Sequence, residues 1–260
     1  MTTHEPPARA ALAVFVLVAC GFAACGRIPG QFEIVQNQQP SGGCAIDTSE
    51  TLYRGDGTLD LQLVQAGGRS AYLMFPLVRN NLPASSGDGP DANQIQMHSF
   101  AVDIGPSEFG ALPPNVAMLF DSLTKAQRDS ADYALLHYSV PWSATLGSGG
   151  GSAATLVGAF PIDLARRVAA TGDVGGARTS MIVNAHVRAF GSTDTQDLES
   201  DPFDFPIYVC SGCLVGNVLT CPYMSEPANT GNPCNVAQDN FVDCCSLNGA
   251  LLCPPIVSGQ

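Results

Sequence analysis

The chain of 260 residues carries little charge, because Asp, Glu, Lys and Arg together make up only 13% of it. Lysine is nearly absent, and 23 acidic residues against 11 basic ones give a formal net charge of −12. A surface this acidic repels nucleic acids and anionic lipid headgroups. We therefore expect no nucleic-acid partner. The low charge, together with 27 glycines and 19 prolines, is typical of an exported β-rich domain.

The chain also lacks several motifs that identify hydrolases and nucleotide-binding proteins. It contains no G-x-S-x-G elbow, no H-E-x-x-H zinc motif and no P-loop. His98, His137 and His186 are the only histidines beyond the N-terminal segment, and serine is plentiful. A Ser-His-Asp site that is assembled only in the fold therefore stays open as an alternative. We predict that the protein is not an enzyme and has no catalytic residue and no cofactor.

No apolar run in the N-terminal region is long enough to span a bilayer comfortably, which takes about 20 residues. Residues 10–24 carry no charge, follow Arg9 and are rich in Ala, Val, Leu and Phe. This pattern is typical of the apolar core of a secretory signal peptide. We predict that residues 1–24 are removed on export. A plain secretory signal or an uncleaved N-terminal anchor is the alternative.

The segments LVAC at 17–20 and FAAC at 22–25 resemble the lipobox of bacterial lipoproteins, in which the cysteine is acylated after cleavage. The resemblance covers about the first tenth of the chain. LVAC has the preferred leucine, whereas FAAC departs from the pattern with an aromatic residue. Acylation of Cys25 leaves eight of the ten cysteines for disulfides, but acylation of Cys20 leaves nine. We predict lipidation at Cys25, with Cys20 as the alternative. Acyl chains would then hold the protein to a membrane without spanning it.

The body of the chain shows the period-2 pattern of strands separated by turns. Residues 25–43 combine a tether with a first strand at 32–36, and residues 44–209 form the predicted domain. The clearest strand is 181–189, with His186 and Arg188 outward, and 203–209 repeats its alternation. Leu59, Leu61 and Leu63 predict another half-buried strand. Residues 161–170 look helical, and the polar stretch 121–130 is compatible with a short helix. We predict an all-β fold, an antiparallel immunoglobulin-like or fibronectin-like β-sandwich.

The last segment, residues 210–260, is a Cys-rich extension that we expect to be stapled by disulfides. Its cysteines are Cys210, Cys213, Cys221, Cys234, Cys244, Cys245 and Cys253. Seven cysteines cannot all pair among themselves, so we predict that Cys44 bonds to one of them, with Cys210 or Cys213 as first choice. Cys244 and Cys245 are not expected to bond to each other, because adjacent cysteines form a strained ring.

The C-x-x-C at 210–213 raises two alternatives to a structural disulfide. It follows a predicted strand, as a redox pair does, but the next residues make a poor helix. Two thiolates at this spacing are half of a zinc site, and no second half is present. We predict a disulfide and no metal. The loop residues Asp88, Asp91 and Asn93 lack EF-hand spacing, and the integrin-type tripeptide at 54–56 is explained as a turn.

These features together predict a lipid-anchored, non-catalytic binding or structural protein of a bacterial cell envelope, at the outer membrane or the cell surface. Its expected partners are the membrane, through the N-terminal lipid, and an envelope protein or a glycan. Two alternatives remain open. One is an envelope hydrolase, and the other is a thiol-disulfide oxidoreductase that uses Cys210 and Cys213.

Overall fold

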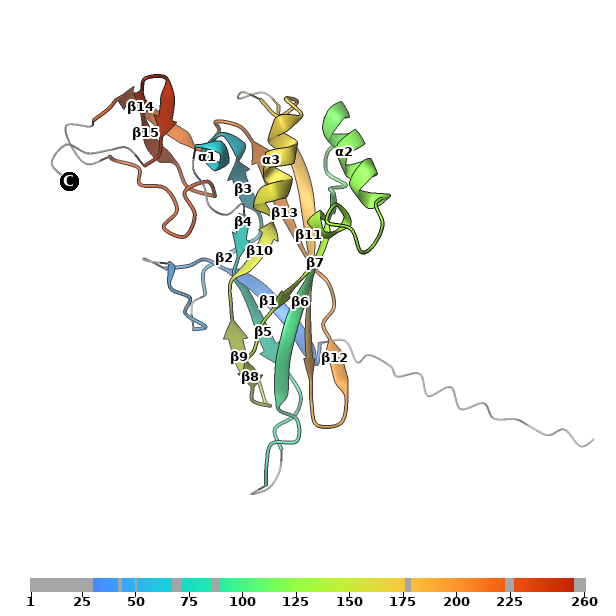
Figure 1. Cartoon of the computed structure of the whole chain (residues 1–260). Helices are drawn as coiled ribbons and strands as arrows, with labels where there is room; N and C mark the ends of the chain where they lie inside the picture. The colour runs from blue at the N-terminus through green and yellow to red at the C-terminus, as the bar shows by residue number, and fades with distance from the viewer. Residues whose placement is uncertain are drawn as a thin grey trace, which may run out of the picture.

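The computed structural model describes residues 30–41, 44–49, 51–66, 72–85, 89–175, 179–222 and 227–254. The predicted signal peptide, with Cys20 and Cys25, lies outside the described residues. Within them, strands dominate and the α-helices are short (Figure 1). These helices are α1 (Leu61–Gln65), α2 (Pro114–Thr124) and α3 (Ile162–Ala170). The predicted all-β class is confirmed. No helix among the described residues has the length and apolar character needed to cross a bilayer.

The largest sheet has seven strands. Its main path runs β3 (Gly57–Asp60), β13 (Phe203–Cys210), β11 (Met181–Ser192), β6 (Ile95–Pro106) and β7 (His137–Pro141), with β12 (Asp197–Glu199) beside β11 and β8 (Thr145–Leu146) beside β6. β11 alternates buried and partly exposed residues along its whole length, as its sequence predicts. Every pair in this sheet is antiparallel except β3 with β13, which is parallel. Because buried and partly exposed residues alternate along β11, one face of the sheet is apolar and the other is polar.

A second layer covers the apolar face. It contains a four-stranded sheet and a two-stranded sheet. The strands are β2 (Tyr53–Arg54), β1 (Phe32–Gln38), β5 (Pro76–Asn80) and β9 (Ser152–Ala154), and then β10 (Val157–Phe160) with β4 (Tyr72–Met74). β1 contacts β11, and β10 contacts both β6 and β11. The ring of Tyr72 lies 5.6 Å from that of Phe205, centroid to centroid. The core thus lies between the layers.

The predicted strand through Leu59, Leu61 and Leu63 is wrong in its second half. β3 ends at Asp60 and α1 begins at Leu61, and all three leucines are buried. The carboxylate of Asp60 accepts a hydrogen bond of 2.9 Å from the backbone N–H of Gln62, so it caps the helix. A short helix that directly follows a strand can also bury alternate leucines. The leucine pattern therefore does not reveal that the strand ends and a helix begins at Leu61.

α2 also begins earlier than its polar C-terminal half suggested. It starts at Pro114, the first-turn position that proline favours, and ends at Thr124. Its buried residues are Val116, Phe120 and Leu123, spaced as on one helix face. α3 agrees with the predicted helix at 161–170, with Pro161 as its N-cap residue.

The Cys-rich extension packs on the body. Its sheet orders β14 (Val215–Thr220), β15 (Val242–Leu247) and β16 (Ala250–Leu252). Residues 237–239 run along the free edge of β3. The N–H of Asp60 donates to the carbonyl of Ala237 over 2.9 Å, and the N–H of Asp239 donates to the carbonyl of Thr58 over 3.0 Å. This contact covers an edge strand that would otherwise expose its backbone.

All eight described cysteines form disulfides, which confirms the predicted disulfide-bonded character. The pairs are Cys44–Cys234, Cys210–Cys213, Cys221–Cys245 and Cys244–Cys253. The first choice of Cys210 or Cys213 as the partner of Cys44 is wrong. Cys210 and Cys213 bond to each other in the turn that follows β13, and the segment that folds back along β3 carries Cys234. Cys244 and Cys245 are neighbours in β15 and face opposite sides, so they reach different partners.

Candidate functional site

The outer face of the seven-stranded sheet carries a row of alternating histidines and carboxylates. His137 on β7 lies opposite Asp103 on β6, Asp103 lies opposite His186 on β11, and His186 lies opposite Asp204 on β13. Directly opposed residues of antiparallel strands have neighbouring side chains. The register therefore brings together four polar groups from four strands that are far apart in the sequence.

These groups are joined in ion pairs. Asp103 bonds Nδ1 of His137 over 2.7 Å and Nη2 of Arg188 over 3.0 Å, and Nη1 of Arg188 donates to Glu199 over 2.9 Å. His186 pairs with Asp204 through its Nδ1. Burial acts to raise the pKa of Asp103, but the hydrogen bonds from His137 and Arg188 outweigh it and the pKa lies below the ordinary value. The row thus consists of two paired groups, one of His137, Asp103, Arg188 and Glu199 and the other of His186 and Asp204.

His98 stands apart from this row. Its Nε2 lies 2.9 Å from Oγ of Ser192, which is the contact a general base makes with a nucleophile. His98, but not Ser192, lines a pocket of about 480 Å³, whose other lining residues are Met97, Pro141, Trp142 and Ser143. Among the described residues, no carboxylate hydrogen-bonds the ring of His98. Ser192 therefore contacts a histidine that has no carboxylate partner. His137 and His186 have carboxylate partners, but in the described part of the chain neither hydrogen-bonds a serine.

The chain was expected to contain no Ser-x-x-Lys motif of the penicillin-binding type, but Ser122 and Lys125 form that pattern at the C-terminal end of α2. Such a pair is catalytic in penicillin-binding enzymes when the serine opens a helix. Here it lies in the last turn of α2. Ser122 Oγ donates to the carbonyl of Leu119 over 2.8 Å, and Lys125 pairs with Asp121 over 2.7 Å. Both residues are exposed, so they are ordinary surface partners.

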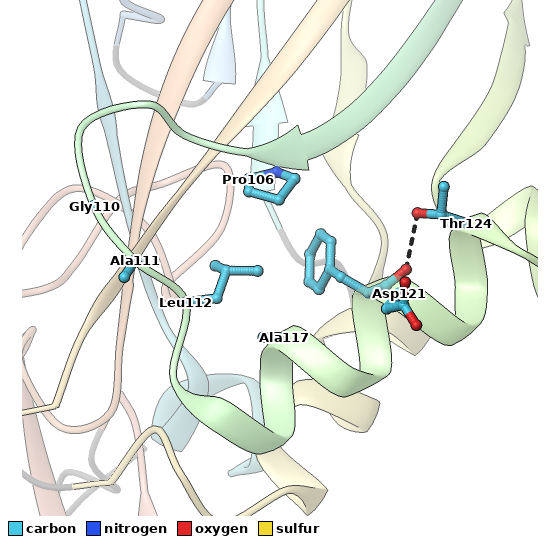
Figure 2. Close-up of a pocket in the computed structure, with 8 residues that line it drawn as sticks. Pro106, Gly110, Ala111, Leu112, Ala117, Asp121 and Thr124 are labelled. Carbon is cyan, nitrogen blue, oxygen red and sulfur yellow. Dashed lines mark hydrogen bonds between the residues drawn. The ribbon is translucent and has the colours of Figure 1, made fainter.

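A second pocket, of about 400 Å³, lies between α2 and the loop that follows β6 (Figure 2). Pro106 and Leu112 point into the same space above Ala117. Thr124 Oγ1 at its rim donates to the carbonyl of Phe120 over 2.8 Å. Phe109, in the adjoining loop, is 82% exposed. The polar atoms at the rim are satisfied, so the pocket suits an apolar group.

The C-x-x-C lies beside a buried carboxylate that sequence analysis missed. Asp60 is fully buried, and besides capping α1 it accepts hydrogen bonds from the N–H groups of Gly212, over 2.7 Å, and Leu214, over 2.8 Å. Its carboxylate and the sulfurs of Cys210 and Cys213 lie within 4.8 Å of one another, the one group of possible metal ligands in the described part of the chain. The disulfide leaves no thiolate to bind a metal. β14, not a helix, follows the pair.

Two further sequence features have structural roles. Asp91 accepts hydrogen bonds from the N–H of Ser148 and the hydroxyl of Ser85, and these lower its pKa to about 2. Arg54, of the integrin-type tripeptide, lies 3.6 Å from the carboxylate of Asp239 and donates to Asn240 over 3.3 Å. It therefore faces the extension. Asp88 lies outside the described residues.

No protein-family model matches the chain, and no curated protein or solved structure matches it either. The immunoglobulin-like or fibronectin-like connectivity therefore stays a prediction.

Proposed function

We propose that the protein is a lipid-anchored, non-catalytic binding protein of a bacterial cell envelope, built on an immunoglobulin-like or fibronectin-like β-sandwich. Four disulfides support export, because such bonds persist in oxidising compartments. The lipobox-like FAAC before the described body supports lipidation at Cys25. The extension and the polar outer face of the large sheet then offer surfaces to a partner.

The proposal that the protein is non-catalytic rests on how serine, histidine and carboxylate groups are distributed over the outer face of the large sheet. A hydrolytic triad needs one histidine between a nucleophile and a carboxylate. Ser192 meets His98, whereas Asp103 and Asp204 meet His137 and His186. The parts of a triad are thus present but separated over the sheet.

The anchor is tested by the mass and location of the mature protein. We expect it to partition with membranes and to carry acyl mass on its N-terminal cysteine. Cys25→Ser should abolish the acylation and Cys20→Ser should not. Acylation that survives Cys25→Ser and is lost in Cys20→Ser would move the site to Cys20. A soluble, unacylated protein would overturn the anchor.

The Ser192–His98 pair favours the hydrolase alternative, and a fluorophosphonate probe tests it. We expect no covalent labelling of Ser192, because no carboxylate among the described residues hydrogen-bonds His98 to orient and stabilise its imidazolium. His98→Gln provides the background. Labelling of Ser192 that His98→Gln abolishes would establish a hydrolase.

The oxidoreductase alternative is favoured by the buried carboxylate of Asp60 beside Cys210 and Cys213. Alkylation of the unreduced protein from cells tests it. We expect both cysteines to be protected as a disulfide. A persistent free thiol at either position would support redox activity.

A further inference from the structure

The pocket at His98 is formed by an irregularity in β6. Residues 97 and 99 of β6 lie opposite the consecutive residues Gly191 and Phe190 of β11, so His98 is an extra residue in the pairing. Such a β-bulge re-aims a side chain that regular pairing would place elsewhere. His98 is exposed on the same side as Ser99, and its Nε2 reaches Ser192 Oγ over 2.9 Å.

Trp142 forms the apolar wall of this pocket. It directly follows β7, and its backbone N–H donates to the carbonyl of His98 over 2.9 Å. Its ring stacks on that of the fully buried Phe100, with centroids 5.2 Å apart and planes at 25°. These contacts fix the indole in place while it stays partly exposed. Nothing in the described part of the chain accepts a hydrogen bond from its indole N–H.

The pocket carries no permanent charge, although the whole chain has a net charge of −12. Beside it, Thr145 Oγ1 donates to Gln96 Oε1 over 2.8 Å, which adds neutral hydrogen-bonding groups. The carboxylate of Asp197 lies opposite Ser192 on β12 but does not line the pocket. A ligand here meets an aromatic face, an imidazole and hydroxyl groups, and no formal countercharge.

We propose that this pocket binds a neutral carbohydrate ring. A sugar ring has C–H groups that pack on an indole and hydroxyl groups at its rim that can bond to His98 and Ser143, which line the pocket, and to Ser192 beside His98. The volume of about 480 Å³ is within the range of small-ligand sites. The net charge of −12 on the whole chain disfavours anionic sugars. The proposal rests on the binding function proposed above and names its ligand class.

The intrinsic fluorescence of the protein tests the proposal directly, because Trp142 is its only tryptophan. The probe is a trimer of N-acetylglucosamine, and a trimer of galacturonic acid is the charged comparison. We expect a saturable change of emission with the neutral trimer and at least tenfold weaker binding of the acidic one. His98→Ala and Ser192→Ala keep Trp142 and should each weaken binding about three- to tenfold, the effect of one hydrogen bond.

His186→Ala is the matched control. This histidine is also exposed on the outer face of the large sheet, but it pairs with Asp204 and does not line the pocket. It should leave binding unchanged. Thermal unfolding of each variant shows whether it folds, and Trp142→Phe, measured by calorimetry, should weaken binding without unfolding the protein.

The outcomes separate the ligand class from the general function. No saturable binding by the folded protein, or equal loss in His186→Ala, would overturn the carbohydrate site and leave the anchored binding function intact. Equal binding of the acidic trimer would overturn selection for a neutral ring. Binding followed by cleavage of the trimer would support the site but overturn the non-catalytic function.

Discussion

The disulfide between Cys44 and Cys234 should contribute more to stability than any other described one. It joins residues 190 positions apart, whereas Cys210 and Cys213 are 3 apart. The chain-entropy relation gives about 5 kcal/mol at 25 °C for the long loop and about 1.6 kcal/mol for the short one. These are upper values, because residual structure in the unfolded chain reduces the entropy that a crosslink removes.

The contacts of the extension determine what remains when this bond is lost. Gln238 still bonds Leu73 through two hydrogen bonds, of 2.9 Å and 3.1 Å. Residues 237–239 still pair with β3. We therefore expect Cys44→Ala/Cys234→Ala to fold with the extension in place, but with a lower free energy of unfolding.

Urea unfolding of two matched double variants measures the difference. Cys44→Ala/Cys234→Ala and Cys210→Ala/Cys213→Ala each remove one disulfide, and intact mass verifies the other three. The first variant should lose about 3 kcal/mol more than the second, seen as a lower midpoint with a comparable slope. Equal losses, or a larger loss in the second variant, would refute loop entropy as the dominant contribution.

Two further predictions concern buried carboxylates. Asp60→Asn removes the acceptor for the N–H of Leu214 and should lower the free energy of unfolding in urea by about 1.5 to 3 kcal/mol. The control Asp56→Asn, at an exposed position, should change it by no more than about 0.5 kcal/mol. Equal effects of the two variants would contradict the role of Asp60. Hydrogen bonds from the Asn229 side chain and the Asn217 N–H lower the pKa of Asp243 from 3.8 to about 2. This carboxylate therefore stabilises the fold above about pH 4, and its contribution is lost as the pH falls toward 2. Near-ultraviolet circular dichroism should show that Asp243→Asn removes part of this acid dependence, and an unchanged profile would contradict it.

The sequence predicted those elements whose periodicity is unambiguous. β11 alternates buried and outward residues over its length, β13 does so up to Val209, and the helix at 161–170 begins after a proline. α1 was missed because its leucines fit a strand as well as a short helix. The deciding group was Asp60, whose capping bond does not change the hydrophobic pattern. Local patterns thus identify regular elements and fail where one side chain ends a strand.

The site residues depend on pairing register, which local patterns do not contain. His186 and Arg188 were correctly placed outward, but Asp103 and Asp204 meet His186 only because three strands align. The bulge that places His98 beside Ser192 likewise appears only when β6 pairs with β11. Cys44 presents the same problem, because its partner depends on where the segment before β15 folds back.

The ends of β1 relate the proposed anchor to the two ends of the molecule. The start of β1, at Phe32, lies close to the start of β6. Just before β1, the carbonyl of Gly30 accepts a hydrogen bond from the side chain of Asn81. The neighbouring Asn80 donates to the carbonyl of Leu146, which lies beside the start of β6. Lipidation at Cys25 would leave five residues to Gly30, a reach of at most about 18 Å. The pocket at His98, proposed above to bind carbohydrate, also involves the start of β6 and would then lie toward the membrane. The extension is joined beyond the other end of β1, through Cys44, and so would face away from it. The two candidate binding surfaces would therefore face different layers of the envelope.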